Sequence, residues 1–272
     1  MRFHILYAML LVSASISTTG VAAPPAALDP LKNWVVDYGE TQCAALREFG
    51  DPAKPIIFGI IPSPDGGTFE LLVKRPRSGP DFAEEMPGIV DFGRGPIKAW
   101  LLYFGTKKGG SSLYQYRISA EQMAQARSAS TVTLHADGGE DFSFRLAVMP
   151  ALLDGLEKCT ADLRQYWNMN AEKSGKLATP SKGDVRRIFD SDDYPSDALR
   201  QDQEGTAQYM LLIDEKGSVA ACHVMKPSGV PVLDAMGCQV IRQRAKFTPA
   251  VDHNGKPIRS TYVTPPIRWA IG

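Results

Sequence analysis

The side chains best suited to acid–base or metal chemistry are few in this chain. Beyond His4, the histidines are His135, His223 and His253, and none has a cysteine or carboxylate at a spacing that suggests a catalytic triad or a metal site. The HExxH, CxxC, P-loop and GxSxG motifs are absent from the sequence. We therefore predict that the chain is not an enzyme, with no catalytic residue, no cofactor and no bound metal.

Two clusters of charge are interpreted as structural features. Arg242, Arg244 and Lys246 crowd the last turns of a predicted helix, where cations suit the helix dipole, and this reading is favoured over a phosphate site. The acidic run Asp190–Asp193 lacks the further ligands of a calcium loop. Lys plus Arg and Asp plus Glu each number 30, so the net charge is zero. That balance argues against nucleic acid as a partner, which normally requires a basic excess.

The first 22 residues have the layout of a secretory signal peptide. Met1–His4 is short and positive, Ile5–Ile16 is apolar, and small residues follow at Gly20–Ala23. The apolar run of about 12 residues is too short to span about 30 Å of hydrocarbon. We predict a signal peptide over residues 1–22 and secretion into an oxidising compartment. Four cysteines then favour two disulfides over a metal site, with three possible pairings.

The sequence pattern of residues 30–168 predicts a β-rich α+β domain that ends in a long helix. Predicted strands cover Ile56–Ile61, Thr68–Lys74, Ile97–Phe104, Leu113–Ile118, Thr131–Ala136 and Asp141–Leu146. Turn residues at Pro64–Gly67 and Asp137–Gly139 indicate two hairpins. Predicted helices cover Thr41–Phe49, Ser119–Ala129, where Ser119 and Gln122 have capping-box spacing, and Met149–Trp167, where an apolar stripe repeats at helical spacing. An uncharacterised enzyme housed in this domain is kept as an alternative.

Residues 169–183 hold almost no apolar bulk and are predicted to be a linker. Residues 184–272 then form a second, smaller domain. Strands are predicted over Gly205–Asp214, Ser218–Met225 and Ser260–Ile271, and helices over Ser196–Gln201 and Val232–Phe247. The fold class is therefore α+β, with a β-rich N-terminal domain followed by a small domain that has a three-stranded antiparallel sheet and two helices.

Short motifs of this second domain occur in an order typical of one known family. They are Tyr194–Ala198, Glu204–Ala207, Ile213–Val219, Lys226–Gly229 with Val232–Asp234, Phe247–Ala250 with Asn254–Pro257, and Pro266–Trp269. In these residues the domain resembles the TonB C-terminal domain family. Lys226–Gly229 departs from the pattern, because many members have two serines there. Trp34, Thr41–Ala45 and Leu156–Cys159 give residues 30–168 a fainter similarity to secreted invasion-associated locus B-type domains.

The resemblance implies a function in the bacterial envelope. TonB proteins carry inner-membrane energy to outer-membrane receptors, and their C-terminal domain binds an extended receptor peptide by adding a strand to its sheet. The sequence has no convincing membrane anchor and no long Pro-Glu or Pro-Lys rod. We therefore predict a periplasmic two-domain protein whose TonB-like module binds an outer-membrane receptor peptide or another envelope protein, linked by resemblance to TonB-dependent transmembrane transport. The alternative is a true energy transducer, anchored in the inner membrane by an uncleaved leader.

Of the three cysteine pairings, we favour the one that keeps each disulfide within a domain, Cys43–Cys159 and Cys222–Cys238. Cys43 lies in a predicted helix and Cys159 on the apolar stripe of another. Cys222 lies on a strand and Cys238 in the helix that must pack on it, and these two also resemble the cysteine pair of a disulfide-bearing subset of the family.

The last strand of the small domain is a candidate for the partner-binding edge. The hypothesis is that a partner peptide pairs with the backbone groups of Tyr262, Val263 and Thr264. Pro265 and Pro266 have no N–H, so pairing must stop or bulge there. The alternative is that these prolines protect the edge against unwanted partners.

Overall fold

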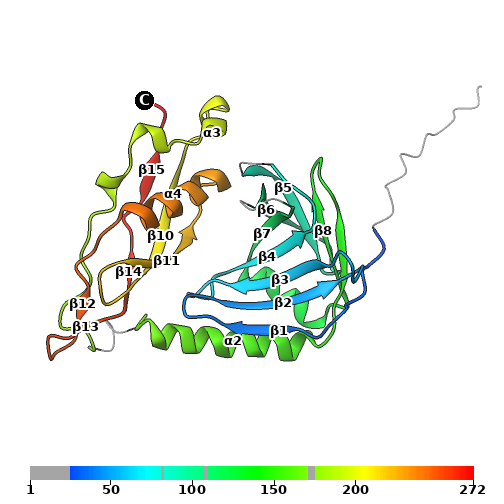
Figure 1. Ribbon diagram of the computed structural model, residues 1–272, viewed down its shortest axis with the longest axis horizontal. Coiled ribbons are helices and arrows are strands. Elements are labelled where there is room, and N and C mark those ends of the chain that lie inside the picture. Colours follow the sequence, from blue (N-terminus) through cyan, green and yellow to red (C-terminus); the bar gives the residue numbers. More distant parts are fainter. Residues whose placement is uncertain (1–24, 81–82, 107–109, 171–174) are drawn as a thin grey trace, which may run out of the picture.

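The computed structural model describes residues 25–80, 83–106, 110–170 and 175–272. It is a mixed, strand-rich structure dominated by a nine-stranded sheet and a four-stranded sheet (Figure 1). The signal peptide predicted over residues 1–22 lies outside the described residues. In the part of the chain that the structure describes, no helix has both the length and the apolar character needed to cross a membrane.

The larger sheet is antiparallel and has the strand order β1-β2-β3-β4-β7-β6-β5-β8-β9. Its strands are β1 (Val35–Tyr38), β2 (Cys43–Phe49), β3 (Ile56–Pro62), β4 (Thr68–Arg75), β5 (Glu84–Asp91), β6 (Pro96–Gly105), β7 (Ser112–Ser119), β8 (Thr131–Ala136) and β9 (Phe142–Arg145). The sheet curls until the segment before β1 reaches both of its ends. Leu28 forms a bridge with Phe144 of β9, and Pro30 forms one with Phe49 of β2.

The inside of the curl is the main hydrophobic core. Buried and half-buried residues alternate along β7 and β8, as expected when every second side chain points inward. The rings of Phe58 and Phe144 stack with their centroids 4.8 Å apart, and Phe49 meets Phe144 edge-on at 4.9 Å. Each fully buried ring of this kind stabilises the fold by about 1.5–3 kcal/mol.

The predicted local signals of this region are found in the structure. β3 and β4 form a hairpin, as do β8 and β9. Ser119 begins the short helix α1 (Ala120–Met123) with a reciprocal capping box, because its hydroxyl accepts from the Gln122 N–H at 3.1 Å and the Gln122 Oε1 accepts from the Ser119 N–H at 2.8 Å. The helix continues as a 3-10 segment, η1 (Ala124–Ser128).

The long helix α2 (Met149–Tyr166) lies along β1 and β2 (Figure 1). Its apolar stripe is buried at Leu152, Leu156, Cys159 and Leu163. Trp167 ends the helix and is buried, with its indole Nε1 donating to the Glu40 carbonyl at 2.6 Å.

The helix predicted over Thr41–Phe49 is wrong. Cys43–Phe49 is strand β2, which pairs with β1 on one side and β3 on the other. The sequence of β2 contains Ala, Leu, Arg and Glu, which favour helices in isolation. Pairing on both sides and burial of Cys43, Ala45 and Phe49 outweigh that weak local preference.

The strand β5 was missed because Pro87 lies inside it. A proline lacks the N–H that a ladder needs and counts against a central strand. Here the Pro87 carbonyl accepts from the Asp137 N–H at 3.1 Å, at the point where the pairing of β5 with β8 ends. The proline nitrogen faces the same side, so only the reciprocal hydrogen bond at the end of that ladder is missing, and the pairing with β6 is unaffected.

The smaller sheet is built around β10 (Gly205–Ile213). β11 (Val219–Lys226) forms one edge, and β14 (Ser260–Val263) and β15 (Ile267–Trp269) share the other. The three predicted strands are thus four in the described residues, because Pro265 and Pro266 divide the last one. The remaining elements are η2 (Arg186–Ile188), η3 (Ser191–Asp193), α3 (Ser196–Arg200), α4 (Pro231–Arg244), β12 (Ala250–Val251) and β13 (Pro257–Ile258).

The helix α4 covers one face of this sheet (Figure 1). Tyr209, Leu211 and Ile213 of β10 are buried in a cluster with Ile241 of α4. The segment predicted as a linker also contacts this part of the molecule, because Lys182 and Thr248 exchange backbone hydrogen bonds of 3.0 and 2.8 Å. The end of the predicted linker therefore belongs structurally to the C-terminal part.

Candidate functional site

The strand β14 forms one edge of the smaller sheet. Its backbone N–H and C=O groups alternate between facing β10 and facing away from the sheet. Its register pairs Leu211 with Tyr262 and Met210 with Val263. One residue further on, the Thr264 N–H donates to the Tyr209 carbonyl at 2.9 Å. Backbone groups alternate in direction along an antiparallel strand, so those of Tyr262 face β10, like those of Thr264. The N–H and C=O groups of Thr261 and Val263 face away from the sheet.

Of the predicted trio, Val263 alone has its backbone groups on the outward side of β14. Val263 has its side chain 46% exposed and its backbone on the open edge. Tyr262 turns its backbone inward, and its hydroxyl donates to the Gly183 carbonyl at 3.2 Å. Thr264 is buried, with its N–H committed to Tyr209 and its carbonyl accepting from the Gln208 amide at 2.9 Å. Thr261, which was not predicted, replaces it as an outward-facing residue.

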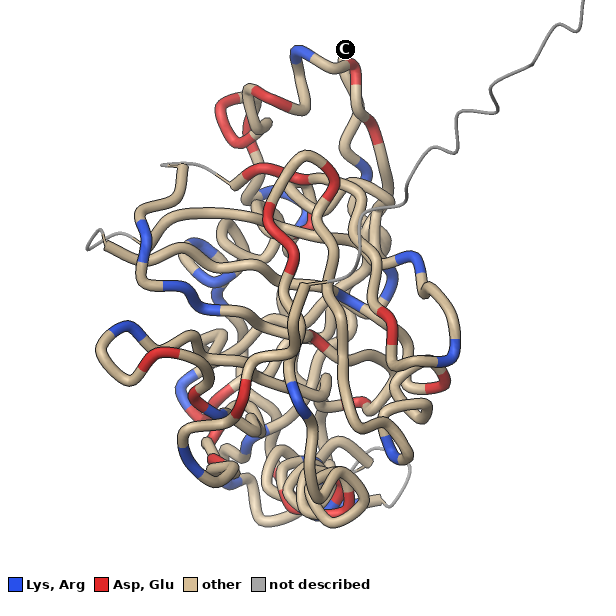
Figure 2. The backbone as a smooth tube through the Cα atoms, turned by 90° about the vertical axis from the view of Figure 1, so that its right-hand side faces the viewer, with Lys and Arg blue, Asp and Glu red and all other residues tan. Residues whose placement is uncertain are grey.

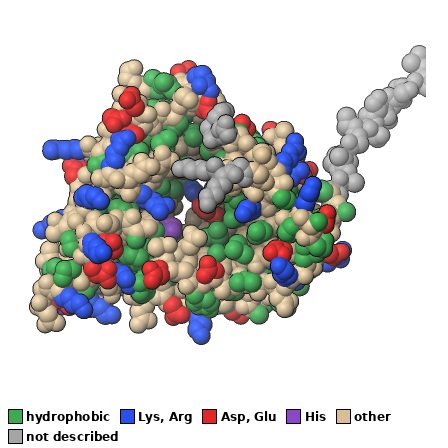
Figure 3. Space-filling model, viewed as in Figure 1, with side chains coloured by type: hydrophobic (Ala, Val, Ile, Leu, Met, Phe, Trp, Pro, Cys, Tyr) green, Lys and Arg blue, Asp and Glu red, His purple; other side chains and the backbone are tan. Residues whose placement is uncertain are grey.

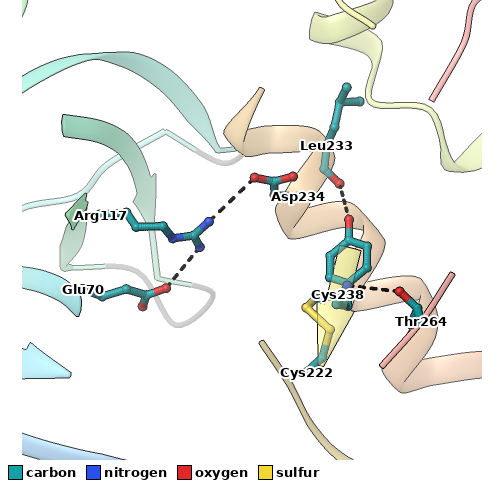
Figure 4. The surroundings of a disulfide bond; sticks show 8 residues. Glu70, Arg117, Cys222, Leu233, Asp234, Cys238 and Thr264 are labelled. Atoms are coloured by element: carbon teal, nitrogen blue, oxygen red, sulfur yellow. Dashed lines mark hydrogen bonds and ion pairs between the residues drawn. A yellow bond between two sulfur atoms is a disulfide. The ribbon is translucent and has the colours of Figure 1, made fainter. Parts of the chain in front are cut away.

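The two disulfides join Cys43 to Cys159 and Cys222 to Cys238, the pairing favoured from the sequence. The first ties β2 to α2. The second ties β11 to α4 and lies beside a cleft (Figure 4). Because each disulfide links a strand to the helix that packs on it, each fixes one sheet–helix layer.

A cleft of about 360 Å³ separates β11 from the outer face of the large sheet. Figure 3 shows this hollow, with a histidine side chain visible beside it. Its lining combines the hydroxyl, amide and charged groups of Ser63, Thr68, Glu70, Gln115, Arg117, His223, Asp234 and Arg242 with apolar side chains. A polar cleft of this size is within the range used by small-molecule and peptide sites.

Arg117 crosses the cleft between two carboxylates (Figure 4). Its Nη2 lies 3.2 Å from Glu70 Oε1 and its Nη1 lies 3.7 Å from Asp234 Oδ2. The Asp234 side chain is 3% exposed, and this burial raises the pKa of its carboxyl, although a hydrogen bond from the Ser228 N–H and the nearby Arg117 act in the opposite direction. The pair therefore holds a costly buried carboxylate between the two parts of the molecule.

Glu85 of β5 makes a second link across this interface. Its Oε2 accepts from the Val232 N–H at 3.3 Å in the first turn of α4, and its Oε1 accepts from the Gln203 amide at 2.6 Å. The N-cap residue of α4, Val230, has no side-chain acceptor, so a carboxylate from the other part of the molecule satisfies the helix terminus. Burial raises the pKa of the Glu85 carboxyl.

His223 lies on β11 and belongs to the lining of this polar cleft. Its Nε2 is shielded from solvent and has no hydrogen-bond partner within the described residues. Burial lowers the pKa of the imidazole, against the opposing effect of Glu70 and Asp65. At neutral pH the side chain is therefore a neutral hydrogen-bonding group.

The residues of the cleft and of the Glu85 link were not found from the sequence because they come from distant segments. Glu85 and Val232 are 147 positions apart, and no local motif connects them. The hydroxyl, amide and charged groups of the cleft lining can bind a polar ligand. Across the described ranges, no group of three or more His, Cys, Asp and Glu side chains is placed to hold a metal ion.

One comparison with known proteins gives a match. Residues 191–271 match the family model described as Gram-negative bacterial TonB protein C-terminal. The matched segment begins at η3 and contains all four strands of the smaller sheet together with α4. No curated protein and no solved structure is detectably similar to the chain. Over residues 191–271, the chain is therefore similar to the TonB C-terminal domain family.

Proposed function

We propose that this chain is a periplasmic binding protein that captures an extended segment of an outer-membrane receptor, or of another envelope protein, on the open edge of β14. The family match indicates a TonB-like, envelope-associated role, and the two disulfides suit an oxidising compartment. In this proposal the leader is cleaved, and residues 30–168 and 184–272 act as two domains joined by residues 169–183.

The observation that carries the proposal is the position of Val263. It lies on an edge strand, it is 46% exposed, and its N–H and C=O face away from β10. An extended peptide that pairs with Val263 and Thr261 gains main-chain hydrogen bonds without displacing any strand. Pro265 occupies the next outward position and limits the ladder to a short run.

The distribution of charge favours a protein partner. Figure 2 shows basic and acidic residues interspersed along the backbone, in keeping with a net charge of zero. Strand addition depends on main-chain hydrogen bonds and does not require a surface of one sign.

The test uses the full mature chain, immobilised and exposed to a detergent extract of outer membranes. Three forms are compared: the wild type, Val263→Pro, which removes one outward N–H, and Val263→Thr, which keeps it. The proteins of interest are those retained by the wild type and by Val263→Thr but lost from Val263→Pro. If Val263→Pro is folded and retains the same proteins with unchanged affinity, β14 is not the binding edge.

A further inference from the structure

The opposite edge of the smaller sheet, β11, borders the cleft described above. The register pairs Tyr209 with Val224 and Leu211 with Cys222. Because the Tyr209 carbonyl accepts from Thr264 on the β14 side, Tyr209 and Val224 form a non-hydrogen-bonded pair. The backbone groups of Val224 therefore face away from β10, and those of Cys222, two residues earlier, do the same.

The cleft borders the residues of β11 with which a further strand would pair. Cys222, His223 and Val224 of β11 all line it. Asp234, Ala235 and Cys238 of α4 close it on one face of the sheet, and Gln42 belongs to its lining near the side chain of His223. The opposite wall is formed by strands of the large sheet, including Glu70 and Arg117. The cleft beside β11 is thus bounded by protein on several sides and opens to solvent on the face shown in Figure 3.

Two polar groups of this cleft lack hydrogen-bond partners in the described part of the chain, the Nε2 atom of His223 and the guanidinium of Arg242. The Nε2 of His223 is shielded from solvent without a hydrogen bond. Arg242 is exposed, lines the cleft, and forms no hydrogen bond or ion pair with any described residue. The second arginine of the lining, Arg117, is already held between Glu70 and Asp234. Arg242 is therefore the cation available to a ligand that carries negative charge.

We propose that this cleft binds a short extended segment of a partner protein, which pairs as an added strand with Cys222 and Val224 of β11 and places an acidic side chain against Arg242. The two outward-facing residues provide up to four main-chain hydrogen bonds. The site is separate from the β14 edge, because the two edges lie on opposite sides of β10.

The probe is a fluorescein-labelled hexapeptide that alternates threonine and valine and ends in one glutamate, with a lysine-ended peptide as its control. Fluorescence anisotropy with the full chain measures affinity. We expect the glutamate peptide to bind about fivefold more tightly than the lysine peptide, and Arg242→Glu to reverse this preference. Val224→Pro removes one outward N–H while leaving the pairing with β10 intact, and we expect it to weaken the glutamate peptide about fivefold or more.

The matched control is Val263→Pro, which removes one outward N–H from the other edge of the same sheet. The β11 site is supported if Val224→Pro reduces the peptide affinity and Val263→Pro leaves it unchanged. This result does not depend on whether the β14 proposal is correct. The opposite pattern overturns the β11 site and leaves the β14 proposal standing. Absence of binding to the wild type up to about 1 mM peptide, an affinity of about 4 kcal/mol, also overturns it.

Amide hydrogen exchange of the wild type provides a test that needs no variant to fold. Saturating glutamate peptide should slow exchange at Cys222 and Val224 and leave Thr261 and Val263 unchanged. Slowing confined to Thr261 and Val263, or no slowing at either edge, contradicts the β11 site.

Discussion

Gly237 lies so close to Tyr209 that a Cβ at position 237 would stand 2.0 Å from the tyrosine hydroxyl oxygen. The ring of Tyr209 is fully buried between β10 and α4, and its hydroxyl donates to the Leu233 carbonyl at 3.5 Å. A helix normally disfavours glycine. Here the Tyr209 hydroxyl occupies the space that a side chain at position 237 would need.

We predict that Gly237→Ala destabilises the protein by about 1–3 kcal/mol, because the tyrosine or the helix must shift. The matched control is Gly155→Ala in the middle of α2, where an added Cβ has nothing within 4 Å. That variant should gain about 0.5–1 kcal/mol from helix propensity. Urea unfolding measures both. If both substitutions stabilise the protein, or both destabilise it, the packing argument is wrong.

The two disulfides should contribute unequally to stability. The Cys43–Cys159 disulfide spans 116 positions and the Cys222–Cys238 disulfide spans 16. The loop-entropy argument gives losses of about 5 and about 3 kcal/mol when each pair is replaced by alanines. Thermal unfolding of the two double variants checks the order. A non-reducing peptide map that finds a cystine between Cys159 and Cys222 would disprove the pairing itself.

Asp234 should give the stability an unusual dependence on pH. Because the pKa of its carboxyl is raised in the folded protein, the folded state binds this proton more tightly than the unfolded chain does. Its contribution to the free energy of unfolding is therefore greatest below the ordinary aspartate pKa of about 3.9 and is lost as the pH rises through the raised value.

The comparison for this prediction is the wild type against Asp234→Asn, which keeps an oxygen to accept from Ser228. The wild type should gain stability relative to the variant as the pH falls from about 7 to about 4. Glu85 is present in both proteins, so the effect of its raised pKa largely cancels in the difference. A relative loss of wild-type stability on acidification would show that the Arg117 pair outweighs burial.

Glu85 should stabilise the start of α4 across the interface between the two sheets. Glu85→Ala removes the acceptor of the Val232 N–H, and we expect a loss of about 1 kcal/mol, the usual effect of deleting an N-terminal cap. Hydrogen exchange in the first turn of α4 should become faster. Glu84→Ala is the control on the same strand and should leave that turn unchanged.

Much of the local structure could be predicted from short-range patterns. The hairpin at Pro64–Gly67, the capping box at Ser119 and the apolar stripe of α2 each depend on neighbouring residues. The strand β2 could not, since its alanines and charged residues favour a helix until β1 and β3 pair with it. The strand β5 was hidden by Pro87, whose nitrogen is tolerated only because the β8 ladder ends there.

The candidate sites divide in the same way. Motif order located the segment that matches the TonB family model, but which residues of its β14 strand face outward depends on the register with β10. A single hydrogen bond from Thr264 to Tyr209 decides it. The cleft residues Arg117, Asp234 and His223 come together only when the two sheets are in contact. Their spacing along the sequence therefore could not predict the cleft.

Both disulfides join cysteines that are consecutive along the chain, the first to the second and the third to the fourth. If the chain crosses a membrane from its N-terminus, Cys43 finds Cys159 as its first available thiol, and Cys222 later finds Cys238 when the earlier pair is already closed. An oxidant that joins thiols in order of arrival thus makes the native pairs directly, with no later exchange of partners. On that route, the connectivity requires no disulfide-reshuffling catalyst.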